Sequence, residues 1–270
     1  MTTLNHKVLF PLFAAVVVAL SSCGGNGPEE PEDPDGPVIP GKVERVSLFS
    51  TELNKQLVTT VWLPAGYDEN KTYPFLYLLH GYGDDNDSWI QKGLANTIAD
   101  SYIHDKGVPM VIIMPNGLTS FYIGDYETYM HETLMPELEE AFHCNGKRAV
   151  AGLSMGGYGT LYHALKYPEK FKYAYAMSPA TDEVVSLPDY VPTLASLSQA
   201  HDPSEYPPIT LESGTQDYTV RIQFVSNLAD ILHSNGLRCD FIERSGGHDW
   251  NFWPVCLQKA LVKIGETFNK

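Results

Sequence analysis

Short apolar runs alternate with amphipathic stretches from Lys42 to the C-terminus, and this alternation constrains the fold more than any other feature of the chain. Apolar runs bounded by Gly, Pro or Asn are typical of strands buried on both faces of a sheet. We predict six such strands, at residues 74–79, 110–114, 148–151, 172–177, 209–212 and 240–243. Two earlier runs, 43–50 and 57–63, are joined by a polar turn and predict a leading antiparallel hairpin.

The stretches between the strands carry apolar residues at helical spacing. We predict helices at residues 89–101, 126–142, 157–167, 219–234 and 252–268. Strands that alternate with helices form βαβ units, so the expected class is α/β, with a mostly parallel central sheet and helices on both faces. The long irregular segment 180–208 is expected to form a small lid or substrate-contact insertion, because loops of that size in a compact domain are usually functional or mobile.

Length and charge limit the class of protein. The chain has 270 residues, and about 230 remain without a leader and a tail, which suits one catalytic domain, predicted over residues 42–270. The 18 Lys and Arg side chains are outnumbered by 33 Asp and Glu, a formal net charge of −15 at pH 7. Nucleic-acid binding needs a face rich in Lys and Arg, so the sequence argues against a nucleic-acid partner.

The N-terminus has the pattern of an export signal. Residues 1–7 are polar with one lysine, residues 8–20 are apolar, and Leu-Ser-Ser-Cys ends at Cys23. These last four residues resemble the lipobox of bacterial lipoproteins, in which the cysteine becomes the lipidated first residue. We therefore expect a lipoprotein signal peptide over residues 1–22 and lipidation of Cys23; an ordinary signal with a chance cysteine is the alternative.

Residues 24–41 are rich in Pro, Gly and acidic side chains and offer no apolar face to bury. With Cys23 they predict a disordered tether, residues 23–41, that holds the domain away from a membrane. Acids directly after a lipidated cysteine resemble the surface-export signal of some Gram-negative lipoproteins, although a simple spacer has the same composition. The expected location is the outer membrane of a Gram-negative bacterium, on its periplasmic or its cell-surface side, with no membrane contact beyond the anchor.

The other three cysteines, Cys144, Cys239 and Cys256, form no C-x-x-C pair, and the sequence allows either one disulfide among them or buried free thiols. No metal is expected, because His131 lacks a second histidine four residues on and residues 84–87 lack the glycine and distal glutamate of an EF-hand loop. No cofactor is expected either, since the chain has no Gly-rich phosphate loop followed by Lys and Ser or Thr.

The pattern Gly-x-Ser-x-Gly occupies residues 152–156, directly after a predicted strand and directly before a predicted helix. This is the context of a nucleophile elbow, in which a serine lies on a sharp turn between the two elements. Gly152 and Gly156 must lack side chains so that the helix can pass close to the strand. We predict that Ser154 is a nucleophile; a serine that caps a helix N-terminus is the alternative.

A serine hydroxyl is a poor nucleophile until a histidine accepts its proton, and the histidine needs a carboxylate to hold its tautomer. His248 follows the last predicted strand behind two glycines, and Asp217 follows the strand before it. Loops at the carboxyl ends of parallel strands are where such sheets build their sites. The predicted catalytic residues are therefore Ser154, Asp217 and His248, in the chain order of α/β-hydrolases. Asp182 and Asp249 remain alternatives for the acid.

An oxyanion needs two backbone donors, one from the residue after the nucleophile and one from the loop after an earlier strand. Met155 supplies the first N–H group. The strand at residues 74–79 ends in His80-Gly-Tyr-Gly, whose glycines let the backbone approach a substrate, and the amide of Tyr82 is the predicted second donor. His80 is expected to brace this loop by hydrogen bonds instead of acting as a base.

Together these motifs resemble the esterase branch of the α/β-hydrolase superfamily that contains esterase D, S-formylglutathione hydrolases, antigen 85 mycolyltransferases and the feruloyl and acetylxylan esterases of carbohydrate esterase family one. The resemblance covers nearly the whole predicted domain and rests on residues 78–83 with Trp89, 152–157, 214–217 and 246–253. The run Gly-His-Asp-Trp-x-x-Trp is its most specific part and points toward bacterial feruloyl-esterase-like members. It implies an α/β-hydrolase fold with Ser154, Asp217 and His248 as the triad and Tyr82 and Met155 as oxyanion amides.

The resemblance further implies a serine esterase that works through an acyl-enzyme and removes feruloyl or acetyl groups from plant-wall poly- or oligosaccharides. The alternatives are an acyltransferase of the mycolyltransferase type, a general short-chain esterase and, least favoured, a non-catalytic carbohydrate-binding lipoprotein. Four aromatic residues are candidates for a platform that binds a phenolic acid or a sugar ring, with core packing as the alternative for each: Trp89, Tyr122, Trp250 and Trp253.

Overall fold

The computed structural model describes residues 36–180 and 190–270. The predicted signal peptide, Cys23, most of the tether and the alternative acid Asp182 lie outside the described residues. The chain divides into two units, Met1–Pro37 and Val38–Lys270, and the fold below is that of the second unit. None of the helices within the described ranges is long and apolar enough to cross a membrane.

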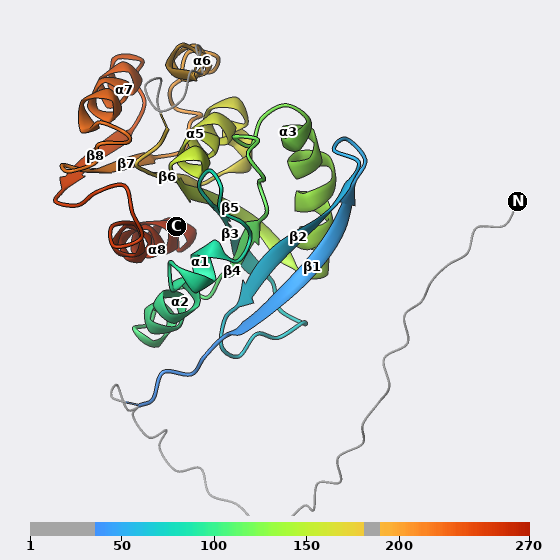
Figure 1. The fold of residues 1–270 in the computed structure, drawn as a ribbon. Coiled ribbons are helices and arrows are strands. Elements are labelled where there is room, and N and C mark those ends of the chain that lie inside the picture. The colour runs from blue at the N-terminus through green and yellow to red at the C-terminus, as the bar shows by residue number, and fades with distance from the viewer. Residues whose placement is uncertain (1–35, 181–189) are drawn as a thin grey trace, which may run out of the picture. The chain divides into compact units, whose positions relative to one another are not determined.

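The described residues form an eight-stranded sheet in the order β1-β2-β4-β3-β5-β6-β7-β8 (Figure 1). The strands are β1 (Lys42–Ser50), β2 (Lys55–Leu63), β3 (Tyr73–Leu79), β4 (Val111–Pro115), β5 (Cys144–Leu153), β6 (Tyr173–Met177), β7 (Ile209–Gly214) and β8 (Cys239–Arg244). β1 pairs with β2 and β2 with β4 in antiparallel fashion, whereas all other neighbours are parallel. The predicted leading hairpin and the mostly parallel sheet are both confirmed.

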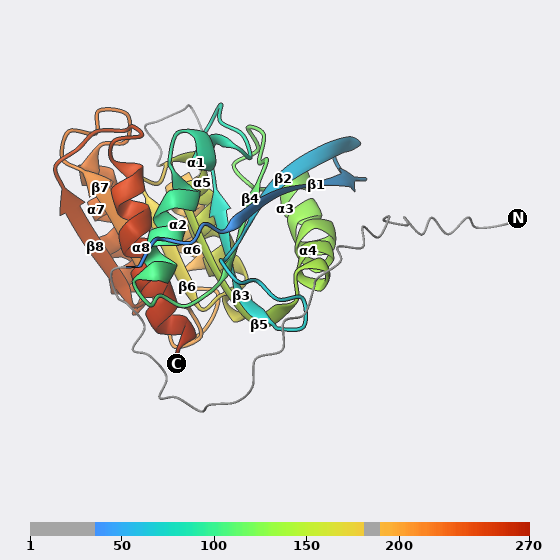
Figure 2. The same ribbon diagram turned by 90° about the horizontal axis from the view of Figure 1, so that it is seen from below.

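Helices cover both faces of the sheet, as predicted (Figures 1 and 2). One face is covered by α1 (Ser88–Gln91), α2 (Ala95–His104) and α8 (Trp253–Phe268). The other is covered by α3 (Asp125–Tyr129), α4 (Met135–Ala141), α5 (Met155–Lys166), α6 (Tyr190–Leu197) and α7 (Ile222–Ser234). Successive residues of β3 alternate between the two cores: Tyr77 and Leu79 pack on the α5 side, and Leu76 and Leu78 on the α8 side.

Three segments differ from the predicted elements. The helix predicted at residues 89–101 is divided into α1 and α2 by a turn at Gly93, where a Cβ atom would lie 2.7 Å from the Trp250 ring. The helix predicted at residues 126–142 contains a π-helical segment, Met130–Leu134, between α3 and α4. The segment predicted to be irregular contains α6, which buries Leu194 against the α5 side of the core, while residues 181–189 lie outside the description.

Candidate active site

Ser154 lies on a sharp turn between the end of β5 and the start of α5. Its backbone has φ 51° and ψ −115°, a strained conformation for a residue with a side chain. Hydrogen bonds on both sides hold the turn: the Ser154 amide donates to the Met177 carbonyl (2.9 Å), and the Ser154 carbonyl accepts from the amides of Tyr158 (3.0 Å) and Ala180 (2.9 Å). The surrounding sheet and helix therefore hold the strained turn that carries the Ser154 hydroxyl.

The two glycines of the motif allow this close packing. A Cβ atom on Gly152 would lie 2.5 Å from the carbonyl oxygen of Gly156, and one on Gly156 would lie 2.5 Å from that of Leu79. Both obstacles are backbone atoms, which cannot swing away. The glycines are thus needed for the close approach of α5 to β5 and β3, as the sequence predicted.

The three predicted catalytic residues form a continuous chain of hydrogen bonds. His248 Nδ1 lies 2.7 Å from Asp217 Oδ2, and His248 Nε2 lies 2.9 Å from Ser154 Oγ. An ionised carboxylate can only accept, so Nδ1 carries the imidazole proton and Nε2 accepts the serine proton. The other Asp217 oxygen accepts from the amides of Thr219 (3.0 Å) and Val220 (2.7 Å), and this fixes the buried carboxylate.

The alternative acid within the described residues faces elsewhere. Asp249 is exposed, and its carboxylate accepts a hydrogen bond from the amide of Asn251 (2.8 Å) within its own loop. The geometry therefore favours Asp217 over Asp249 as the partner of His248.

The predicted oxyanion donors flank the serine. Met155 is the first residue of α5, so its N–H group precedes every intrahelical acceptor. On the other side, Gly81 packs on the nucleophile: a Cβ atom at Gly81 would lie 3.6 Å from Ser154 Cβ. Tyr82 is the next residue in that loop. Both predicted donors therefore belong to segments next to Ser154: Met155 follows it in the chain, and Tyr82 follows a glycine that lies close to its side chain.

His80 braces the loop that carries Tyr82. The Gly117 amide donates to His80 Nε2 (2.8 Å), so the imidazole proton is on Nδ1, which donates to the Gly81 carbonyl (2.7 Å). Burial lowers the pKa of His80 although the bond to Gly81 opposes it, and the ring stays neutral at pH 7. His80 is a structural tie between the loops after β3 and β4, as predicted.

The structure corrects two of the four candidates for an aromatic platform. Trp89 and Tyr122 have no exposed surface, so they cannot face a substrate. Trp89 Nε1 donates to the Leu79 carbonyl (3.1 Å), and the Tyr122 hydroxyl accepts from the His80 amide (2.9 Å). Both side chains pack in the core and use their polar tips to hold the end of β3 next to the serine.

The other two candidates lie beside the histidine. The Trp253 ring is 5% exposed and packs edge-on against the His248 ring, with centroids 5.1 Å apart. Trp250 is half-buried and packs edge-on against Trp253 and Trp89, each at 5.2 Å. Trp250 therefore keeps exposed surface near His248, whereas Trp253 packs against the His248 ring and supports it.

One aromatic side chain near the serine was missed in the sequence. The Tyr82 ring is 62% exposed and lies 6.1 Å from the Phe121 ring, whereas the sequence argument used only the Tyr82 amide. An aromatic residue between two glycines at the end of a strand is the signal that could have found it, because its two neighbours have no side chains that could cover the ring.

The three described cysteines are free thiols: Cys239 and Cys256 are buried and Cys144 is half-buried. Of the two states that the sequence allowed, the structure has unpaired thiols. Within residues 36–180 and 190–270, no group of three or more His, Cys, Asp or Glu side chains is arranged to hold a metal ion.

A mostly parallel sheet, a strained serine elbow and a histidine and carboxylate at the following strand ends define the α/β-hydrolase class. A family model described as "Putative esterase" matches residues 50–264. The chain therefore belongs to this esterase family, and the predicted enzyme class, a carboxylic ester hydrolase, is confirmed at the level of the family.

Two curated relatives are similar over most of this chain. An endo-1,4-beta-xylanase/feruloyl esterase of Xylanibacter ruminicola is 28% identical over 243 residues, which cover 83% of this chain but only 31% of that protein. An acetyl esterase of Caldicellulosiruptor saccharolyticus is 26% identical over 264 residues, which cover 81% of this chain and 96% of the relative. The chain thus spans less than a third of the first relative and nearly all of the second.

Solved structures are similar in the same region. A ferulic acid esterase superposes with a TM-score of 0.75 and 25% identity, covering 85% of this chain and all of that one. A ferulic acid esterase from Anaeromyces mucronatus, in complex with ferulic acid, superposes with a TM-score of 0.70 and 21% identity, covering 86% and 93%. The second match supports the fold alone.

Proposed function

We propose that the chain hydrolyses carboxylic esters through an acyl-enzyme on Ser154, with His248 as general base and acid and Asp217 as its orienting carboxylate. The observation that carries the proposal is the unbroken hydrogen-bond chain from Asp217 through His248 to Ser154, at 2.7 and 2.9 Å. Its distances suit proton transfer without further rearrangement.

In the first half of the reaction, Ser154 Oγ attacks the ester carbonyl carbon as its proton passes to His248 Nε2. The imidazolium that forms is stabilised by Asp217, which holds the Nδ1 proton and stays ionised. The carbonyl oxygen becomes an oxyanion and accepts hydrogen bonds from the amides of Met155 and Tyr82, each such donor contributing about 2.7 to 4 kcal/mol to the transition state.

The tetrahedral intermediate then collapses, and His248 Nε2 gives its proton to the leaving alcohol oxygen. The acyl group stays on Ser154 Oγ as an ester. Water attacks this ester in the second half, with His248 again taking the proton and returning it to Ser154 when the acid is released. Every proton in this cycle passes among Ser154, His248, the leaving alcohol and water, so its transfer needs no cofactor.

For the substrate, we propose feruloyl or acetyl esters of plant-wall poly- or oligosaccharides. Two observations support this choice: the curated relatives are named feruloyl esterase and acetyl esterase, and aromatic surface lies beside the site. Tyr82 follows Gly81, which lies close to Ser154, and Trp250 packs on the Trp253 ring, which contacts His248. Exposed aromatic faces at this position suit a phenolic acid or a sugar ring.

Turnover of methyl ferulate, acetylated xylan and p-nitrophenyl acetate by the wild type and by Ser154→Ala tests both levels of the proposal. We expect hydrolysis that is lost in Ser154→Ala, with methyl ferulate or acetylated xylan preferred over the simple short-chain ester. Equal turnover in the variant would remove the serine mechanism. Activity on the short ester alone would remove the polysaccharide substrate but keep the mechanism.

We also propose that the protein is an exported lipoprotein, anchored by Cys23 to the outer membrane of a Gram-negative bacterium. The support is the apolar run that ends in Leu-Ser-Ser-Cys and the acidic Pro/Gly segment behind it. Palmitate labelling of the wild type, absent in Cys23→Ala, is the expected result. Label retained in the variant would contradict the anchor.

A further inference from the structure

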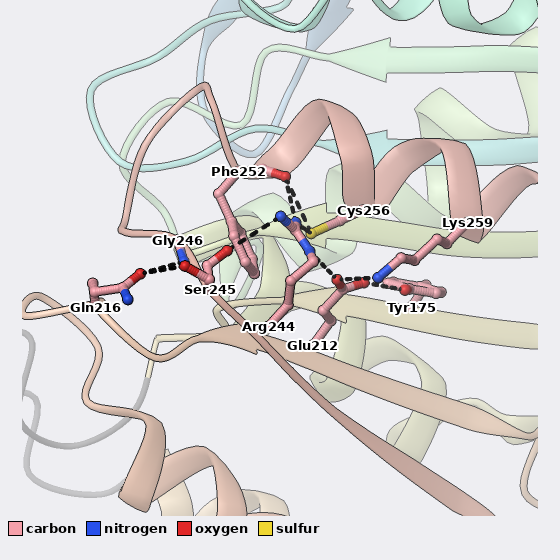
Figure 3. Close-up of polar contacts among 9 residues, drawn as sticks. All are labelled: Tyr175, Glu212, Gln216, Arg244, Ser245, Gly246, Phe252, Cys256 and Lys259. Carbon is pink, nitrogen blue, oxygen red and sulfur yellow. Dashed lines mark hydrogen bonds and ion pairs between the residues drawn. The ribbon is translucent and has the colours of Figure 1, made fainter.

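A fully buried carboxylate lies in β7, two residues before the strand ends and the loop that carries Asp217 begins. Glu212 has no exposed surface, and three side chains satisfy it (Figure 3). Arg244 Nε donates to its Oε1 atom (2.9 Å), Lys259 Nζ donates to the same atom (2.8 Å), and the Tyr175 hydroxyl donates to Oε2. Burial opposes ionisation, but these hydrogen bonds outweigh it and lower the pKa of Glu212.

Of the two cations on Glu212, Arg244 also reaches the segment that carries His248. Arg244 is the last residue of β8, and the loop 245–251 leads from it to Phe252, the residue directly before α8. Arg244 Nη2 donates to the Phe252 carbonyl (2.8 Å), and its guanidinium lies 3.8 Å from the centre of the Phe252 ring. One side chain therefore ties the two ends of this loop together and joins both to the rigid sheet (Figure 3).

The Phe252 ring, held by Arg244, also contacts the backbone of the loop 245–251. A Cβ atom on Gly246 would lie 2.4 Å from the ring, so the ring and the loop backbone are in direct contact. The next residue, Trp253, packs edge-on against the His248 ring at 5.1 Å. A shift of Phe252 would therefore displace both the backbone two residues before His248 and the ring behind it.

The same loop is tied to the loop that carries Asp217. Gln216 Oε1 accepts hydrogen bonds from Ser245 Oγ (3.1 Å) and the Gly246 amide (2.5 Å), and the Gln216 amide donates to the Gly246 carbonyl (2.9 Å) (Figure 3). These bonds set the spacing of the acid loop and the histidine loop. They do not fix the ends of the loop 245–251 against the sheet. The Arg244 side chain does so.

We propose that Arg244 is a positioning residue for His248: anchored on Glu212, it clamps the ends of the loop 245–251 so that the imidazole spans Asp217 and Ser154. This inference rests on the proposed serine mechanism. Misplacement of a catalytic group by about 1 Å can cost a hundredfold in rate, so the effect belongs in kcat and not in substrate binding.

The test compares Arg244→Met with Lys259→Met on the same ester. Each variant removes one cation from the same oxygen of the same buried carboxylate, but Lys259 lies on α8, seven residues beyond Phe252. We expect Arg244→Met to lower kcat about tenfold to a hundredfold with KM changed less than about twofold. Lys259→Met should lower the unfolding temperature to a similar extent and keep kcat within about twofold.

Equal kcat for the two variants at a temperature where both are folded would overturn the inference, because Arg244 would then only neutralise Glu212. Should Arg244→Met fail to fold, Arg244→Lys keeps the charge beside Glu212 but is too short to hold Phe252 as well. It is expected to show the same loss in kcat, and wild-type kcat in this variant would also overturn the inference. Ser154→Ala, measured in parallel, separates the two proposals: activity in that variant removes the serine mechanism itself.

Discussion

At the scale of single residues, the proposed mechanism depends most on Asp217 as the acid. Its carboxylate is buried. One oxygen accepts hydrogen bonds from two backbone amides, and the other accepts one from His248 Nδ1. Only an acceptor at this point keeps the Nδ1 proton in place, because an amide nitrogen there would donate and favour the other tautomer.

We therefore predict that Asp217→Asn lowers kcat by about 10⁴-fold, with little change in KM, since the variant keeps the shape of the side chain but selects the wrong imidazole tautomer. Steady-state hydrolysis of p-nitrophenyl acetate measures it. Asp249→Asn is the matched control, because that carboxylate is exposed and bonds its own loop, and its kcat should stay near that of the wild type. A large loss in Asp182→Asn together with an active Asp217→Asn would reverse the assignment.

The site residues differ in how far the sequence could identify them. Ser154 and His248 belong to short motifs in which the neighbouring glycines are themselves required by the packing, so the local pattern was enough to predict the two residues that the structure brings within hydrogen-bond distance. Trp89 and Tyr122 were open between a substrate platform and core packing, since nothing in the local sequence tells a buried ring from an exposed one, and the structure places both in the core. The role proposed for Arg244 has no local signal, because its partners Glu212 and Phe252 are brought to it only by the fold.

At the scale of elements, prediction was accurate where the pattern is local. All the predicted strands exist, with ends shifted by a few residues, because apolar runs between turn residues mark them directly. At the break between α1 and α2, Gly93 packs close to Trp250, which is far away in the sequence. The π-helical turn at Met130–Leu134 gives no periodic signal, and α6 has a short pattern within a polar segment.

The π-helical segment is joined to α5 by two histidines. His163 Nε2 donates to the Tyr122 carbonyl (2.8 Å), so its Nδ1 atom accepts from His131 Nε2 (3.0 Å). His131 Nδ1 in turn accepts from Lys170 Nζ (2.9 Å). This series of hydrogen bonds requires both imidazole rings to be neutral. Burial, with the neighbouring His163 and lysines, lowers the pKa of His131 to about 3, and burial lowers that of His163 to about 4.

This pair should make the fold sensitive to acid. Both pKa values lie below the usual value of 6.5, so the unfolded chain binds more protons between about pH 6.5 and pH 4. The stabilisation is complete above pH 6.5 and is lost as the pH falls toward 4, by up to about 1.4 kcal/mol per pH unit for each histidine. Urea unfolding at pH 7.5, 5.5 and 4.5 measures the free energy of unfolding.

The comparison that isolates the pair is His131→Gln/His163→Gln, since glutamine does not titrate. We expect the double variant to be less stable than the wild type at pH 7.5 but to lose less stability on acidification. His104→Gln serves as the control, because that histidine lies on α2 on the other face of the sheet. Parallel pH dependences for the wild type and the double variant would show that the buried pair stays neutral in the unfolded chain as well, or titrates in the folded one.

At the scale of the whole molecule, the class of fold followed from the sequence but the order of the strands did not. Alternating strands and helices predict a parallel sheet whatever the order. That β4 lies between β2 and β3, and that the leading hairpin joins the sheet through β2, depends on long-range pairing such as Val61 with Ile113. Such pairs leave no local pattern, because all the central strands are apolar and the sequence does not show which of them are neighbours.

The same architecture predicts which part of the chain is needed for activity. The second unit begins at Val38, and its first residues are already bonded to the sheet's covering helices: the Gly41 amide donates to Asp100 Oδ1 (2.7 Å), and β1 starts at the next residue. All the proposed catalytic and oxyanion residues lie beyond Val38. We therefore expect a chain of residues 38–270 to keep the unfolding temperature within about 2 °C and kcat/KM for a soluble ester within about twofold of the full chain.

A shorter chain, residues 51–270, is the matched control. It lacks β1, which pairs along its whole length with β2, and so leaves the edge of β2 unpaired and removes the bond to Asp100. Its unfolding temperature should fall by more than about 5 °C. Because β2, β4 and β3 separate β1 from the elbow strand β5, its kcat should remain measurable below that temperature. Loss of activity already in the 38–270 chain, with its unfolding temperature unchanged, would mean that residues before Val38 take part in the reaction.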